Sequence, residues 1–425
     1  MRRRNSNGSA ALVDEGPGVT MAQATRTPIW LAGFFALAAL SSPLLLMFGN
    51  KSMVVVLAVL AVPSVAALGR GGAWRHGWNR AVLVAGGVLL AWAALSVLWA
   101  HVPALVLPKA ARLLGLSVCG LSVCAAARLL DETSRRRVLQ ALGAGFVLAA
   151  AVAALLSYIP SISFLAEASG IDGEISLSHY KNIASAGMVM SATALAAAWQ
   201  RRAWVFALLL LATIVLLVER TGNLTGGVAL LLVLVAAVVP CRWGVALAAA
   251  FSSVLFMALP LAHLLPGSAV LARALPFLPN SFLHRTEIWR FAAERAWERP
   301  FLGWGLDASR ELPGGDADVV VWIRLGNGEI GRFPSQILPL HPHDFLLQVW
   351  LELGLVGVVL LAVLLVVLLA AVRRSSVAVT TLVAALAVAA ASFSLWQSWW
   401  MATLFLSAAM AVALTQEPSS QGRVP

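Results

Sequence analysis

Charged side chains are scarce in this sequence, and their scarcity excludes a soluble globular protein. Only 12% of the 425 residues are charged, whereas 60% are hydrophobic. A soluble domain has roughly 25% charged and about 45–50% apolar residues. Most of the surface of the folded chain must therefore lie in lipid. The unit of organisation is then the membrane-spanning helix of roughly 20 apolar residues.

Cysteine and metal-binding patterns are equally sparse. The chain has three cysteines, Cys119, Cys124 and Cys241, and none is placed to cross-link a polar segment, so we expect them to be small hydrophobic residues of the core. No glycine-rich phosphate loop occurs. The pair His341 and His343 gives too few ligands for a zinc ion. The sequence therefore predicts no metal and no cofactor.

Apolar runs recur along the whole chain and predict an all-α polytopic membrane protein with about 12 transmembrane helices. The expected spans are 29–48, 52–68, 81–98, 113–127, 138–159, 183–199, 203–218, 223–239, 243–264, 344–372, 377–395 and 399–415. The fourth span is short. The amphipathic stretch 102–112 before it is expected to lie in the membrane interface.

The charges between the spans predict which side of the membrane each segment occupies. With the N-terminus in the cytoplasm, inner segments hold 17 of the 30 basic residues but only five of the 19 acidic ones, a net charge of +12, and the rest of the chain nets −1. Basic residues favour the cytoplasmic side. Topology thus accounts for the overall charge of +11, and no nucleic-acid partner is expected.

The span pattern divides the chain into five parts. They are a cytoplasmic tail (1–28), transmembrane helices 1–9 (29–264), a large extracytoplasmic loop domain (265–343), transmembrane helices 10–12 (344–415) and a cytoplasmic tail (416–425). A loop of this length is rarely structureless. We expect it to contain short helices, above all His284–Arg299, which Pro300 ends, and a short extended piece at Val319–Ile323.

A polar stripe runs into the tenth span and is the first candidate for chemistry. Asp344, Gln348 and Glu352 recur at every fourth residue, with His343 at the head of the stripe. Polar groups in hydrocarbon are costly, so such a stripe faces protein or a wet cavity. A histidine there is suited to act as a general base near neutral pH. The alternative is a structural helix cap with helix–helix hydrogen bonds.

Arginines at the outer ends of spans are the second candidate. Arg220, Arg285 and Arg290 carry guanidinium groups that can bind phosphate through paired hydrogen bonds. The alternatives are an arginine that anchors its helix at the membrane surface, for Arg220, and an amphipathic helix on lipid headgroups, for the other two. His179 and Lys181, in a second outer loop, are candidates to line the same cavity as His343, together with His341, Asp344 and Gln348, or they belong to a plain polar loop.

Four short motifs together resemble the O-antigen ligase family. His343-Asp344, followed after nine residues by Gly354 and after two more by Gly357, is similar to the family's histidine signature. In the family the histidine is usually followed by Asn, Ser or Gln, so Asp344 departs from the pattern.

The other motifs precede the histidine in the chain. Arg220-Thr221-Gly222 resembles the family's Ser-Arg-Gly element, with Glu219 in place of the serine. Arg285-Thr286-Glu287-Ile288-Trp289 and Gly303-Trp304-Gly305 resemble its Arg-x-x-Ile-Trp and Gly-x-Gly elements. The resemblance extends over residues 29–415, since the order of the motifs and the large loop before the histidine also agree.

The resemblance implies a metal-independent, GT-C-like glycosyltransferase in the bacterial inner membrane, with its active site facing the periplasm. It would transfer a glycan from undecaprenyl pyrophosphate to a sugar hydroxyl of lipid A-core, with inversion at the anomeric carbon. His343 would be the general base, and Arg220, Arg285 and Arg290 would bind the pyrophosphate. The donor, the acceptor and membrane lipids would be its partners.

Two other functions are compatible with the same features. A Wzy-type polysaccharide polymerase shares the donor and much of the motif set but uses a second lipid-linked glycan as acceptor. A transporter of lipid-linked glycans would bind the same molecule without cleaving it. Transporters often contain paired half-repeats with broken helices, and the sequence shows no internal repeat.

Overall fold

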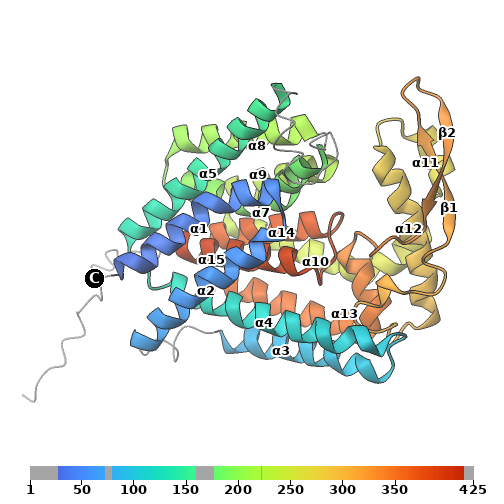
Figure 1. The fold of residues 1–425 in the computed structure, drawn as a ribbon, viewed down its shortest axis with the longest axis horizontal. Helices are drawn as coiled ribbons and strands as arrows, with labels where there is room; N and C mark the ends of the chain where they lie inside the picture. Colours follow the sequence, from blue (N-terminus) through green and yellow to red (C-terminus); the bar gives the residue numbers. More distant parts are fainter. Residues whose placement is uncertain (1–26, 72–78, 159–176, 222, 416–425) are drawn as a thin grey trace, which may run out of the picture.

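The computed structural model describes residues 27–71, 79–158, 177–221 and 223–415, and it is mostly helical (Figure 1). The apolar helices are α1 (Ile29–Phe48), α2 (Ser52–Gly71), α3 (Arg80–Leu95), α4 (Pro103–Ala127), α5 (Glu132–Tyr158), α7 (Leu177–Gln200), α8 (Trp204–Thr221), α9 (Leu224–Val238), α10 (Cys241–His263), α13 (Phe345–Val372), α14 (Ser376–Ala389) and α15 (Ser398–Leu414).

Seven of these helices are long and apolar enough to cross a membrane. An eighth is added when the two halves of α10, bent by 54°, are taken as one span. The helices α8, α9, α14 and α15 are also apolar but shorter. The chain is therefore a multi-pass membrane protein, and twelve spans remain a prediction.

Helix α7 lies at the centre of the bundle. In an 18-residue apolar stretch within Asn182–Gln200, 89% of the residues are buried inside the protein. The helix contacts α1, α8, α9, α14 and α15. Its many Ala, Ser and Gly residues explain this position, because small side chains let helix backbones approach closely in a membrane. The hydroxyls of Thr193 and Thr381 join α7 to α14 at 2.8 Å.

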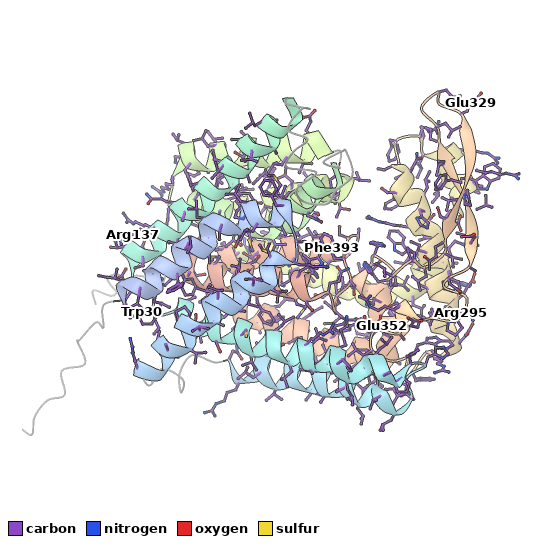
Figure 2. The ribbon with its side chains drawn as sticks, viewed as in Figure 1. Trp30, Arg137, Arg295, Glu329, Glu352 and Phe393 are labelled. Atoms are coloured by element: carbon purple, nitrogen blue, oxygen red, sulfur yellow. The ribbon has the colours of Figure 1, made fainter. Side chains whose placement is uncertain are left out.

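The loops with basic residues gather at one end of the bundle. There Arg135 donates to the Thr415 carbonyl oxygen at 2.8 Å and Arg201 donates to the Leu414 carbonyl oxygen at 3.0 Å. Figure 2 shows Arg137 at this end and Arg295 and Glu329 at the opposite one. The structure thus groups these loops as the charge pattern predicts.

The segment between α10 and α13 lies at the end opposite the basic loops (Figure 1), and its helix α12 (Asn280–Glu298) packs against α10 and α13. This segment, called the hairpin unit below, also contains α11 (Ser268–Ala274), β1 (Asp318–Arg324) and β2 (Ile330–Gln336). The predicted helix His284–Arg299 is confirmed as part of α12, and the predicted extended piece is confirmed as β1. The membrane bundle is helical as predicted, and the hairpin unit adds one antiparallel hairpin of β1 and β2.

The hairpin has a local cause that hydropathy does not reveal. Asn327-Gly328 is a strong turn signal, and Gly328 has a φ of +85° in the turn that joins the strands. Val321 of β1 is buried against Ala272 and Leu283, which tie the hairpin to α11 and α12. The unit therefore has a small apolar core apart from that of the bundle.

Two of the predicted boundaries are wrong. The predicted fourth span starts too late, because α4 runs unbroken over 25 residues from Pro103 and buries Lys109 against Asp307. The predicted span 377–395 ends as α14 at Ala389. Residues 391–397 form an irregular loop, called the carbonyl loop below, whose apolar residues resemble a span in hydropathy alone.

Candidate functional site

His343 is held in an unusual backbone conformation immediately before α13. Its φ is +57°, in the left-handed region that non-glycine residues rarely adopt. Its Nδ1 lies 2.8 Å from the carbonyl oxygen of Ser392 in the carbonyl loop. A carbonyl oxygen only accepts, so Nδ1 carries the proton in this arrangement and Nε2 of the neutral ring keeps a free electron pair.

The environment keeps the His343 ring neutral at physiological pH. Burial lowers its pKa to about 4; the hydrogen bond to Ser392 acts in the opposite direction, and the positive charge of Arg285 lowers it further. A general base must be unprotonated before it acts. His343 therefore has both the tautomer and the charge state of a base at pH 7.

His341 supports His343 from the preceding turn. The two rings lie 4.2 Å apart, and the backbone N–H of His343 donates to Nδ1 of His341 at 3.1 Å. Burial lowers the pKa of His341 to about 3, so its ring is neutral. Because Nδ1 accepts a hydrogen bond, the proton of this neutral ring is on Nε2. This Nε2 lies 3.2 Å from the side-chain amide of Gln397, whose oxygen would be the partner after an amide flip.

Arg285 reaches the same loop from α12. Its Nη1 donates to the carbonyl oxygen of Ala391 at 2.6 Å, and burial lowers its pKa. Ala391 and Ser392 are neighbours, so two successive carbonyls of the carbonyl loop hold the arginine and the histidine. The structure thus brings together two of the predicted site residues that are far apart in the sequence.

Asp344 caps α13, which explains its departure from the family pattern. Its Oδ1 accepts hydrogen bonds from the backbone N–H groups of Leu346 at 2.7 Å and Leu347 at 3.2 Å. Asn and Ser, two of the three residues usual at this position in the family, are also favoured N-caps. Burial raises the pKa of Asp344 to about 7.

Arg290 is placed differently from Arg285. It pairs with Glu287 at 3.4 Å, and Glu287 in turn accepts from the Ser268 backbone N–H at 2.6 Å. Five residues along an α-helix correspond to about 140° around its axis. Arg290 therefore lies on a different face of α12 from Arg285.

Three predicted residues have side chains outside the described part of the chain. His179 and Lys181 belong to the first turns of α7, and Arg220 belongs to the last turn of α8. The turn between α7 and α8 lies with the basic loops, since Arg201 bonds there. The start of α7 and the end of α8 therefore lie at the opposite end of the bundle, where His343 also lies.

The polar stripe of α13 faces protein, as predicted. Gln348 is 1% exposed and Glu352 is fully buried. The amide of Gln348 donates to Glu352 Oε1 and to Ser394 Oγ, both at 2.9 Å, and accepts from the Leu395 backbone N–H at 2.9 Å. The stripe thus binds the carbonyl loop, and sequence reasoning missed this partner.

The glycine motifs mark a place where two backbones meet. Helix α13 breaks at Gly354, whose φ of 63° and ψ of −167° suit glycine alone. The chain after α12 lies against the break: Trp304 and Gly305 donate to the carbonyls of Leu351 and Glu352, and Leu355 donates to Pro300, at 2.8–2.9 Å. These bonds replace the helical ones that the break removes, as the membrane interior requires.

A second charged cluster was not predicted from the sequence. Asp307 Oδ2 accepts from Lys109 Nζ and Arg310 Nε, each at 3.0 Å. Burial is the main cause of the lowered pKa of His341, and the positive charges of Arg310, Arg285 and Lys109 lower it further. Among the described residues, no group of three or more His, Cys, Asp or Glu side chains is arranged to hold a metal ion.

Fold and site together define a multi-pass, mostly helical membrane protein with a neutral histidine and a buried arginine at one end. Residues 186–362 match the O-antigen ligase family model. The matched residues include α12, His343 and the break in α13. The resemblance drawn from the motifs is thereby confirmed over this part of the chain, which is similar to the O-antigen ligase family.

Curated relatives support the same family. A protein of Rickettsia conorii is 30% identical over 129 residues, which are 29% of each chain, and a protein of Rickettsia bellii is 31% identical over 129 residues, 29% of this chain and 30% of the relative. Both are named "Putative polysaccharide ligase". The match thus spans less than a third of the length of these relatives.

Proposed function

We propose that this protein is an O-antigen ligase of the bacterial inner membrane with its active site facing the periplasm. It transfers a glycan from undecaprenyl pyrophosphate to a sugar hydroxyl of lipid A-core. The observation that carries the proposal is the pair of adjacent carbonyls, Ala391 and Ser392, that hold Arg285 and His343 at one site. One residue is suited to take a proton, and the other to bind a phosphate.

The reaction assigns a role to each group. Nε2 of His343 takes the proton of the acceptor hydroxyl, whose oxygen attacks the anomeric carbon from the side opposite the leaving group. The bond from that carbon to the pyrophosphate oxygen breaks, and its electron pair leaves with the pyrophosphate. Arg285, Arg220 and Arg290 stabilise this growing negative charge, so that the reaction needs no metal. Attack from the opposite face inverts the anomeric carbon.

Charge and substrate chemistry support the proposed orientation. The basic loops occupy the end opposite His343, and basic loops favour the cytoplasm. Both substrates are lipids, so each can reach the site from the bilayer. We include a GT-C-like glycosyltransferase fold in the proposal, since the site lies where apolar helices meet an outer unit.

Purified protein tests the proposal directly. The donor is a polymerised glycan on undecaprenyl pyrophosphate, and the acceptor is either lipid A-core or a second lipid-linked glycan. Excess EDTA removes metal ions from both reactions. Product on lipid A-core, with an inverted linkage, supports the ligase. Product only on the second lipid-linked glycan would establish the polymerase instead. Binding of the donor without any cleavage would overturn both in favour of a transporter.

A further inference from the structure

The carbonyl loop holds the two central residues of the site through backbone atoms only. Ala391 accepts from Arg285 at 2.6 Å and Ser392 accepts from His343 at 2.8 Å. The loop has no regular structure between Ala391 and Gln397. Its carbonyls are therefore placed by whatever binds the rest of the loop.

The other half of the loop is bound by the polar stripe of α13. The Leu395 backbone N–H donates to Gln348 Oε1, and Ser394 Oγ accepts from Gln348 Nε2, both at 2.9 Å. The Trp396 indole N–H donates to Glu352 Oε2 at 2.7 Å. Two side chains of one helix thus fix three successive residues of the loop.

Glu352 is the point at which separate parts of the chain meet. Its carboxyl group accepts hydrogen bonds from the Ser309 hydroxyl and the Asp307 backbone N–H, which follow α12, as well as from Gln348 and Trp396. It is fully buried within a membrane helix. Ionisable groups there are costly and are typically functional. Four donors from three segments account for its presence.

We infer that Gln348 and Glu352 are positioning residues for glycan transfer, because they fix the loop whose carbonyls hold the proton on His343 Nδ1 and the guanidinium of Arg285. This inference rests on the proposed function. When the loop is released, the proton of the neutral ring is free to move to Nε2, which then no longer accepts the acceptor's proton. The rate of transfer falls although neither residue touches the substrate.

The test uses the full chain in lipid nanodiscs with ¹⁵N-labelled histidine. The protein has seven histidines, so the signals of His343 are identified by their absence in His343→Asn. Trp396→Phe removes the indole N–H and keeps the ring, and Gln348→Leu removes both bonds to the loop. Trp400→Phe is the matched control, because the Trp400 indole N–H is buried and has no partner among the described residues.

In wild-type protein at pH 7, Nδ1 of His343 should carry the proton and Nε2 should not. Trp396→Phe and Gln348→Leu should populate the other tautomer and lower kcat at least about 10-fold. Their His343 pKa should also fall, since the lost Ser392 bond is one that raises it. Trp400→Phe should leave tautomer, pKa and rate unchanged.

Two results would overturn the inference. In the first, both loop variants keep the Nδ1 tautomer and full transfer. In the second, both lose transfer while the tautomer is unchanged, which would assign Gln348 and Trp396 a role in folding alone. If Gln348→Leu does not fold, Trp396→Phe and Ser394→Ala answer the same question. The tautomer measurement needs no substrate. A wild-type protein that shows the Nδ1 proton but transfers no glycan would contradict the proposed function, while control of the His343 tautomer by the loop would still be shown by the loop variants.

Discussion

Arg285 and His343 bind neighbouring carbonyl oxygens of one loop, those of Ala391 and Ser392. This relationship fixes the arginine and the histidine relative to each other without a direct bond between them. A group bound by Arg285 is therefore presented at a set position to the base.

Arg285 should need its guanidinium shape as well as its charge. Arg285→Ala and Arg220→Ala should each nearly abolish transfer in folded protein, and Arg285→Lys should restore little, because a single ammonium cannot hold Ala391 and also form a paired bond to phosphate. Initial rates with purified protein are the measurement. Full activity of Arg285→Lys would contradict paired binding there and would make Arg290 the next residue to test.

Asp344 should act as a helix cap, and its charge should lower stability at high pH. Asp344→Asn keeps an acceptor for Leu346 and Leu347 and should transfer at close to the wild-type rate. Asp344→Ala should lose about 1 kcal/mol of stability.

Asp344 should make the folded protein less stable as pH rises. Burial raises its pKa from 3.8 to about 7 in the folded protein, so the folded state holds this proton more tightly than the unfolded state does. Its contribution to stability is therefore lost as pH rises from about 4 to 7. Thermal unfolding should show Asp344→Asn gaining on wild type across this range. A constant difference between the two proteins would contradict the raised pKa.

Gly354 should be irreplaceable at the break in α13. Its backbone conformation alone costs about 1–3 kcal/mol for any other residue. An added Cβ would also overlap the backbone of Phe301. Gly115→Ala in α4 is the control, since no atom lies within 4 Å of the added Cβ, and alanine should gain about 1 kcal/mol there. Equal unfolding temperatures for the two variants would argue against the packing of the two backbones.

The orientation in the membrane is open to a direct test. Reporter fusions at Gly315 and Gly170 should report the periplasm, and fusions at Ser134 and Trp78 should report the cytoplasm, because basic loops stay inside. A cytoplasmic signal at Gly315 would end the proposed mechanism, since the lipid-linked donor is used on the outer side.

Side-chain pattern predicted much of this protein. Each expected span coincides with a helix, α12 lies where its sequence indicates, and His343 and Arg285 meet although the chain separates them. Hydropathy and short motifs are properties of side chains. The spans, α12 and the positions of His343 and Arg285 can therefore be predicted from residue types. The break at Gly354 is marked in the sequence by a motif glycine, whose partner segment the sequence does not identify.

The missed features depend on backbone atoms and on tertiary partners. The carbonyl loop contributes Ala391 and Ser392 through their main chain, which no residue type reveals. For the same reason the predicted span 377–395 includes apolar residues of this loop, although α14 ends at Ala389. Lys109 falls outside the predicted fourth span, because its partner, Asp307, is distant in the sequence. Such pairs become visible only when the chain is folded.

The central claim is that Nε2 of His343 removes the acceptor proton, and the rate of transfer by His343→Asn measures it most directly. Asparagine tolerates the left-handed backbone that the position requires, so the variant should fold and still bind the donor. Removing a positioned base lowers a rate by about 10²–10⁴-fold. The account predicts a loss of this size with donor binding retained. Wild-type transfer by His343→Asn would contradict it.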